Sequence, residues 1–113
     1  MKDYPQIVSD ISANLKGLRK DIGPTLQGFT ALAQGAMTTG ALDPKVKELI
    51  ALAIGVANRC DGCIGFHTQA LVKLGVSRQE FEEALGVAVY MGGGPSLMYA
   101  ADAIAAYHQF STG

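Results

Sequence analysis

The chain has 113 residues, of which 49% are hydrophobic and only 17% are charged. This length suits one domain rather than two, and so much apolar surface on a small domain leads us to expect subunit contacts that cover part of it. The net charge of −1 and the isoelectric point near 6.0 argue against a nucleic-acid-binding protein, which needs a basic face.

Helical periodicity recurs along the chain, and we find neither a strand pattern nor an internal repeat. The pattern predicts six helices, at about residues 4–20, 24–37, 44–58, 60–74, 77–91 and 96–110. Six helices within a single domain of residues 1–113 predict an all-α, bundle-like fold.

Several helix ends carry local signals. Gly23-Pro24 separates the first two helices, and Asp43-Pro44 is an N-cap followed by a first-turn proline. Ser77 and Glu80 have the spacing of a capping box, which opens the fifth helix. Gly75 suits the left-handed residue that commonly ends a helix.

We expect most large apolar side chains to be buried. On the second helix, the inward-facing residues are predicted to be Leu26, Phe29, Leu32 and Ala33. The third helix beyond Glu48 is apolar on nearly every side, which is typical of a helix buried on most faces. Core packing is also favoured over a substrate pocket for Tyr90, Met91, Met98 and Tyr99. Asp102 is expected to be an outward-facing charge, and His108 a partner of the C-terminal helix dipole.

The sequence shows no signal for export or for membrane insertion. Its longest apolar run, Leu49 to Ala57 with one glycine, has nine residues, whereas a membrane span needs about 20. Residues Met1 to Pro5 have no apolar h-region. We therefore expect a cytoplasmic location, where a C-x-x-C pair is more often catalytic or metal-binding than a structural disulfide.

The two cysteines and one of the two histidines form a motif with an acidic residue. The motif is E-x11-C-x2-C-x3-H, made by Glu48, Cys60, Cys63 and His67. Cysteines three apart at a helix start can form a disulfide, and the unpaired N–H groups and dipole there favour thiolate over thiol. His67 lies on the same helical face as Cys63, so it can accept the thiol proton.

The third and fourth helices are predicted to form a hairpin that turns near Arg59. Glu48 lies eleven residues before Arg59 and His67 lies eight after it, a mismatch of roughly 5 Å along a helix. In an antiparallel pair, Glu48 and His67 therefore lie at similar depth, where the carboxylate can orient the imidazole and raise its basicity. The order of the cysteines stays open on these grounds, because Cys60 is nearer the helix start and Cys63 is nearer His67.

The motif resembles that of the alkylhydroperoxidase D-like branch of the carboxymuconolactone decarboxylase family. The apolar run, the Leu71–Gly75 helix ending and the Glu82–Ala84 segment resemble it too. The resemblance spans about Leu42 to Ala106, within a family-like core of about residues 24–108. It implies an all-helical fold, assembly as trimers or hexamers, and thiol-dependent peroxidase or disulfide reductase activity.

By resemblance, Cys63 attacks the peroxide, Cys60 resolves the sulfenic acid as a disulfide, and Glu48 and His67 form a proton relay. The best-described members carry another histidine just before the second cysteine, where this chain has Gly62. This difference removes one member of the relay. The decarboxylases proper lack the cysteine pair, so decarboxylation of a lactone is the less expected activity.

Other chemistries fit the same residues less well. Zinc could be held by two thiolates, His67 and Glu48, but structural zinc sites more often use two ligand pairs, so we predict no metal. C-type haem attachment needs a histidine directly after the second cysteine, and Ile64 stands there. Arg59 is either a charge that favours the thiolate or a solvated side chain.

We therefore predict an oligomeric thiol oxidoreductase that needs no cofactor and binds neither nucleic acid nor membrane. It would reduce a hydroperoxide with formation of a Cys60–Cys63 disulfide, and a thioredoxin-like or lipoyl-type protein would restore the dithiol. The alternatives are a carboxymuconolactone decarboxylase-like enzyme acting on a small acid, and a non-catalytic oligomeric scaffold.

Overall fold

The fold is seen in a computed structural model that describes residues 1–112. Its six helices are α1 (Tyr4–Asp21), α2 (Gly23–Met37), α3 (Pro44–Ala57), α4 (Asp61–Lys73), α5 (Arg78–Gly92) and α6 (Gly94–Thr112). Strands are absent from these residues, so the predicted all-α class is confirmed. Each predicted helix is present, and its ends differ by at most two residues from the expected ones.

The helix ends follow the local signals of the sequence. The Asp43 carboxylate accepts a hydrogen bond from the backbone N–H of Val46 at 2.8 Å. Ser77 and Glu80 form the complete capping box at the start of α5. Gly75 has a φ of 77° just after α4, a conformation that glycine adopts without steric cost. Boundaries set by such local contacts can be read from sequence.

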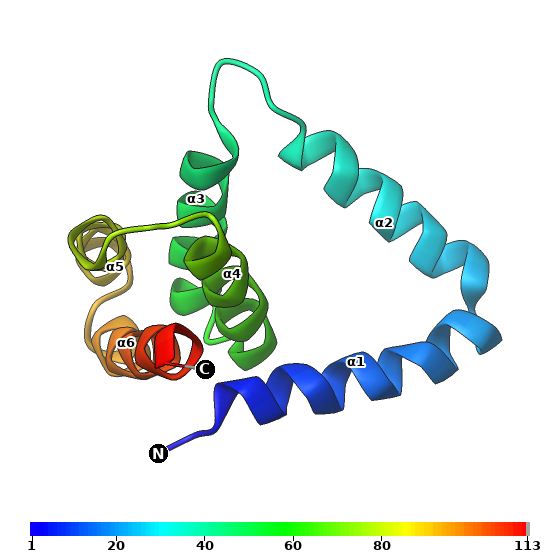
Figure 1. The fold of residues 1–113 in the computed structure, drawn as a ribbon, viewed down its shortest axis with the longest axis horizontal. Helices are drawn as coiled ribbons and strands as arrows, with labels where there is room; N and C mark the ends of the chain where they lie inside the picture. The colour runs from blue at the N-terminus through cyan, green and yellow to red at the C-terminus, as the bar shows by residue number, and fades with distance from the viewer. Residues whose placement is uncertain (113) are drawn as a thin grey trace.

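Helices α3 to α6 pack around one core, and α1 crosses beside α4 and α6 (Figure 1). The largest fully buried apolar side chains are Tyr4, Leu52, Val56, Ile64, Leu71 and Phe81. Ala100, Ala103 and Ala106 of α6 are also buried, and their small side chains let that helix approach its neighbours closely. This core fixes the relative positions of α3 and α4, which carry the predicted site.

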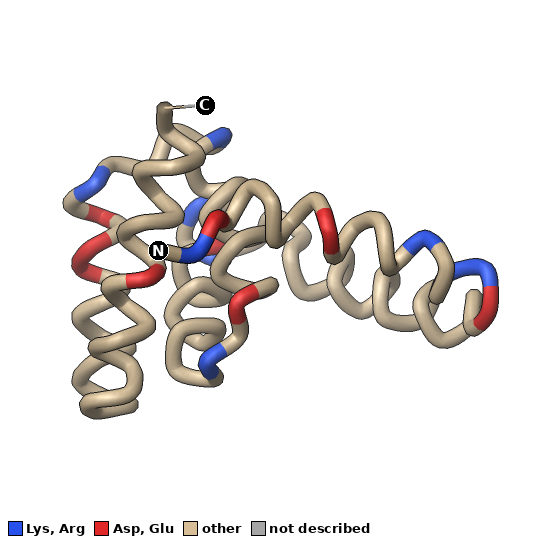
Figure 2. Tube along the Cα trace, turned by 90° about the horizontal axis from the view of Figure 1, so that it is seen from below, with Lys and Arg blue, Asp and Glu red and all other residues tan. Residues whose placement is uncertain are grey.

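Helix α2 stands apart from this core and continues α1 as an arm (Figure 1). None of its residues is buried, and Phe29 and Leu32 are each 68% exposed. The prediction that the apolar face of α2 lies inward in the domain is therefore wrong for this chain alone. From the bend at Ile22–Gly23, α2 runs back toward the start of α3 and touches the α3–α6 core only there (Figure 1), so its apolar residues find little of their own chain to cover them. The charged residues of the arm all lie on α1 (Figure 2).

Further apolar residues are exposed on α3, α5 and α6. Ile50 and Ile54 lie on the outer side of α3, opposite the buried Leu52 and Val56, so α3 is covered on fewer faces than expected. Together with residues of α5, they line a surface hollow of about 300 Å³. Within residues 1–112, no helix combines the length and the apolar character needed to cross a membrane.

The expectation of core packing near the α5–α6 turn is also mostly wrong. Tyr90, Met91 and Met98 are exposed, and only Tyr99 is partly buried. The reason is their position, because the first two end α5 and Met98 follows shortly after the turn, beyond the reach of the core. Gly93 has a φ of 73° at the turn between α5 and α6, a conformation that glycine adopts without steric cost.

Candidate active site

The turn between α3 and α4 places both cysteines at the start of α4. Arg59 has a φ of 54°, and the N–H of Cys60 donates to the carbonyl of Gly55 at 3.0 Å. The chain thereby reverses between Ala57 and Asp61. The side chain of Arg59 is exposed and forms no ion pair in the described part of the chain, which favours the solvated alternative over a contact with the thiols.

Cys60 and Cys63 form a disulfide, as their spacing predicts, with their Cα atoms 5.2 Å apart. Cys60 is the N-cap of α4, and its sulfur accepts a hydrogen bond from the N–H of Cys63 at 3.1 Å. The pair is only partly buried, so reagents can approach it. After reduction, the N–H groups and the dipole at this helix end favour thiolate over thiol.

Glu48 and His67 meet across the α3–α4 hairpin, as the residue count predicts. Nδ1 of His67 lies 2.7 Å from Oε2 of Glu48, and the Glu48 side chain is only 15% exposed. An ionised carboxylate can only accept, so Nδ1 carries the proton in this contact. Nε2 is then the nitrogen that can accept a proton, one helical turn beyond Cys63.

Gly55 permits the close contact of α3 with α4. A Cβ atom at this position would lie 2.8 Å from Cβ of Cys63, closer than two carbon atoms can pack. The sequence analysis did not single out Gly55, although a glycine within an apolar helical run is a recognised sign of close packing. The absence of a side chain at residue 55 therefore helps to bring Glu48 within reach of His67.

Gly62, the residue directly before the second cysteine, packs against α1. A Cβ atom there would lie 2.9 Å from Cδ1 of Ile11. The space that a larger side chain would need is thus occupied by the end of the Ile11 side chain of α1. Sequence periodicity could not reveal this contact, because it joins two segments about fifty residues apart.

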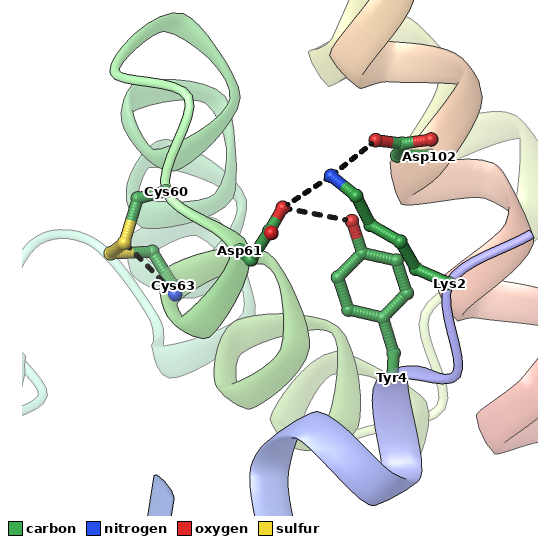
Figure 3. A network of polar contacts seen from close by, with 6 residues as sticks. All are labelled: Lys2, Tyr4, Cys60, Asp61, Cys63 and Asp102. Carbon is green, nitrogen blue, oxygen red and sulfur yellow. Dashed lines mark hydrogen bonds and ion pairs between the residues drawn. A yellow bond between two sulfur atoms is a disulfide. The ribbon is translucent and has the colours of Figure 1, made fainter.

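A polar network surrounds Asp61, the first of the two residues between the cysteines (Figure 3). The Lys2 ammonium forms ion pairs with Asp61 at 2.8 Å and with Asp102 at 3.0 Å. The hydroxyl of Tyr4 donates to the same Asp61 oxygen at 3.4 Å. The expectation of an outward-facing Asp102 is therefore wrong: its side chain is 21% exposed and paired. Sequence analysis missed this network because α1, α4 and α6 meet only in the tertiary structure.

The remaining candidates do not add to the site. His108 is exposed and lies edge-on against Tyr107, with ring centroids 5.9 Å apart. Across residues 1–112, no three His, Cys, Asp or Glu side chains converge as metal ligands do.

Comparisons with known proteins identify the family and agree with the fold. The sequence profile of the carboxymuconolactone decarboxylase family matches residues 24–106. A protein of this family from Legionella pneumophila is 54% identical, and its structure superposes with a TM-score of 0.95 over 98% of this chain and 99% of its own.

Two more distant relatives extend the comparison. A Thermotoga maritima protein of the same family, for which a role in an antioxidative response has been suggested, is 26% identical. Its structure gives a TM-score of 0.73 over 88% of this chain and 91% of its own. An uncharacterized protein of Cupriavidus necator is 32% identical over 88% of this chain and 94% of its own length.

Proposed function

The chain belongs to the carboxymuconolactone decarboxylase family, and we propose that it is a thiol-dependent oxidoreductase that reduces a hydroperoxide or a disulfide. One observation carries the proposal: a Glu48–His67 contact of 2.7 Å lies one helical turn from a disulfide-forming cysteine pair. A thiol pair with an oriented base is the arrangement that nucleophilic thiol chemistry requires. Within the family, these residues support assignment of the chain to the alkylhydroperoxidase D-like branch.

The peroxide reaction starts from the reduced protein. His67 accepts the proton of Cys63, and the thiolate attacks the outer oxygen of the hydroperoxide. The O–O bond breaks, the alkoxide takes up the proton as an alcohol, and Cys63 becomes a sulfenic acid. The sulfur of Cys60 then attacks the sulfur of Cys63, water leaves, and the disulfide forms. Two electrons pass from the dithiol to the peroxide.

A dithiol protein closes the cycle. Its thiolate attacks the Cys60–Cys63 disulfide, and exchange through a mixed disulfide returns two thiols to this chain while the donor is oxidised. A thioredoxin-like or lipoyl-type protein has the required chemistry. A cytoplasmic location suits such a cycle, because thiol reductants are kept reduced there. The suggested antioxidative role of the Thermotoga maritima relative also supports this direction of electron flow.

The proton relay in this chain consists of Glu48 and His67 without a histidine at residue 62. The contact of Ile11 with the turn at Gly62 makes that part of the site apolar. We expect peroxide reduction to be slower than in relatives with the additional histidine, because one proton carrier is absent.

We also propose that the protein acts as a homo-oligomer, a trimer or a hexamer. The exposed apolar side chains of α2 and the apolar hollow between α3 and α5 support this proposal. Exposed apolar patches of this kind generally mark protein–protein contacts.

The proposed activity is tested by counting thiols before and after one equivalent of hydroperoxide is added to the reduced protein. Wild type should lose two thiols and form an intramolecular disulfide. Cys60→Ser should stop at a sulfenic acid on Cys63, which a sulfenic-acid-specific reagent captures, whereas Cys63→Ser should react slowly. A reduced, folded wild type that keeps both thiols under peroxide and under an oxidised dithiol protein would contradict the proposal. The decarboxylase-like and scaffold alternatives would then remain.

A further inference from the structure

The segment Lys2–Tyr4, which we call the strap, ties α6 to the start of α4. The side-chain amide of Gln109 on α6 accepts from the N–H of Tyr4 at 2.8 Å and donates to the carbonyl of Lys2 at 2.7 Å. Two backbone groups of the strap are thus held by one side chain. These hydrogen bonds hold the backbone of the strap in one position, from which the side chains of Lys2 and Tyr4 contact Asp61.

Lys2 is the centre of this arrangement. Besides its ion pairs with Asp61 and Asp102, its ammonium lies 4.7 Å from the ring centroid of Tyr99, within cation–π range. Single surface ion pairs contribute little, whereas a network with several partners can hold a defined geometry. Three partners from two helices make Lys2 a positioned residue rather than a solvated one.

We propose that Lys2 is a positioning residue for the redox pair, which holds the Asp61 carboxylate away from the sulfurs and compensates its charge. The strap would thereby raise the thiolate fraction of the reduced cysteines and favour the dithiol over the disulfide. This inference rests on the proposed function for its biological meaning, but the effect on the thiols can be measured without any peroxidase activity.

The physical reason is the position of Asp61 between the two cysteines. A carboxylate close to a thiol disfavours the thiolate, because two like charges repel each other. In Figure 3 the Asp61 carboxylate points toward Lys2 and Tyr4, on the side away from the disulfide. With Lys2 in place, the helix dipole still stabilises the thiolates at the first turn of α4, and the Asp61 carboxylate repels them less.

The charged and titratable groups around this turn come from every neighbouring element. They are Lys2, Tyr4, Glu48, Arg59, Asp61, His67, Tyr99 and Asp102. The hydrogen bond to Asp61 raises the pKa of the Lys2 ammonium above its ordinary value. Burial, with Asp102 and Asp61, raises the pKa of the Tyr4 hydroxyl. Lys2 therefore stays cationic and Tyr4 neutral over the pH range in which thiols titrate.

The test is the rate of thiol alkylation against pH in reduced protein. Lys2→Met should lower the thiolate fraction at neutral pH about two- to fourfold, the size expected when the Asp61 carboxylate charge is left uncompensated within about 10 Å of the sulfurs in a solvated site. Lys2→Arg should restore it, because the ion pairs can re-form. Lys45→Met is the matched control, since Lys45 pairs with Glu80 on the α3 and α5 side and should leave the thiols unchanged. The ratio of dithiol to disulfide in a glutathione buffer should fall by a similar factor in Lys2→Met.

A double-mutant cycle separates positioning from a remote charge effect. In an Asp61→Asn background, Lys2→Met should lower the thiolate fraction by less than about 1.5-fold, because no carboxylate remains to be held. An equal loss in both backgrounds would overturn the proposed role, as would an unshifted alkylation profile in folded Lys2→Met. Lys2→Gln provides a second neutral variant if Lys2→Met does not fold. A wild type that fails to reduce peroxide would contradict the proposed function, while these comparisons would still decide the role of Lys2.

Discussion

The α3–α4 hairpin and the α1–α2 arm are both pairs of helices joined by a short turn, and both are rich in apolar residues. In the hairpin, the buried residues Leu52, Val56, Ile64 and Leu71 face the core, and a glycine lets the helices touch. In the arm, α2 has no buried residue at all. An apolar helix face is thus covered by the chain in the hairpin and left exposed on α2.

The difference shows what an apolar pattern means physically. The hydrophobic effect favours removal of apolar surface from water, but it does not specify which surface covers it. For the hairpin, the covering surface is the rest of the domain. For the arm, we expect it to be another copy of the chain. Four predictions challenge or refine this comparison.

The largest effect is expected for the Glu48–His67 contact, which joins the two helices of the hairpin. His67→Ala should slow oxidation of the Cys63 thiol at neutral pH by about 10²–10⁴-fold, the usual contribution of a general base. The rate should partly recover at higher pH, because hydroxide then forms the thiolate without His67. Stopped-flow oxidation and alkylation rates measured against pH would check this.

Glu48→Gln is a milder change in the same pair, because it removes the carboxylate charge but can keep a hydrogen bond to His67. It should slow the reaction less, and the double variant should be little worse than His67→Ala, because groups that act as a unit are not additive. If the contact only holds the hairpin together, all three variants would melt earlier while the alkylation profile of the folded protein stayed unchanged. That pattern would refute the relay.

The second prediction concerns the arm. Leu32→Glu should weaken assembly at least about 30-fold, since loss of a central apolar contact commonly costs 2 kcal/mol or more. Gln34→Glu adds the same charge on the opposite side of α2 and should weaken assembly far less. Light scattering over a concentration series gives the mass of each variant. A monomeric wild type at micromolar concentration would show that α2 is not an assembly surface.

The third prediction compares two glycines. Gly55→Ala should destabilise the protein by about 1–3 kcal/mol, because its Cβ would overlap Cys63 in the hairpin. Gly17→Ala on α1, where no atom lies within 4 Å of the added Cβ, should stabilise by about 0.5–1 kcal/mol through helix propensity. Denaturant unfolding would measure both. Equal effects of the two substitutions would contradict close packing at Gly55.

The smallest effect is expected for the surface ion pair between α3 and α5. Lys45, and after it the backbone N–H of Ser77, lower the pKa of Glu80 from 4.5 to about 2. A lowered pKa in the folded state stabilises the protein above the unfolded value, and this stabilisation is lost as pH falls from about 4.5 toward 2. Glu80→Gln should therefore melt slightly below wild type at pH 7, and the difference should vanish by about pH 2. Glu83→Gln on the same helix is the control and should give no such pH-dependent difference.

Much of the site could be predicted because its geometry is local. Cys60, Cys63 and His67 lie within eight residues of one another, so helical periodicity alone puts the thiols and the imidazole on one face. Glu48 could be added because, in an antiparallel hairpin, two residues at similar distances from the turn lie at the same level of the two helices. The contacts of Ile11 with Gly62 and of Lys2 with Asp61 join segments far apart in sequence, and no periodic pattern records them.

The sequence by itself determined the helices, their ends and the redox motif, because capping, glycine conformation and residue spacing act over a few residues. The tertiary structure alone decided which apolar faces are covered, since burial depends on how whole helices meet. In it, α2 is left without buried residues, and Tyr90, Met91 and Met98 are exposed. The helix packing also brings Lys2, Asp61 and Asp102 together. Ion pairs between distant segments form only after the core has fixed those helices, so they are a consequence of the fold that local sequence signals do not contain.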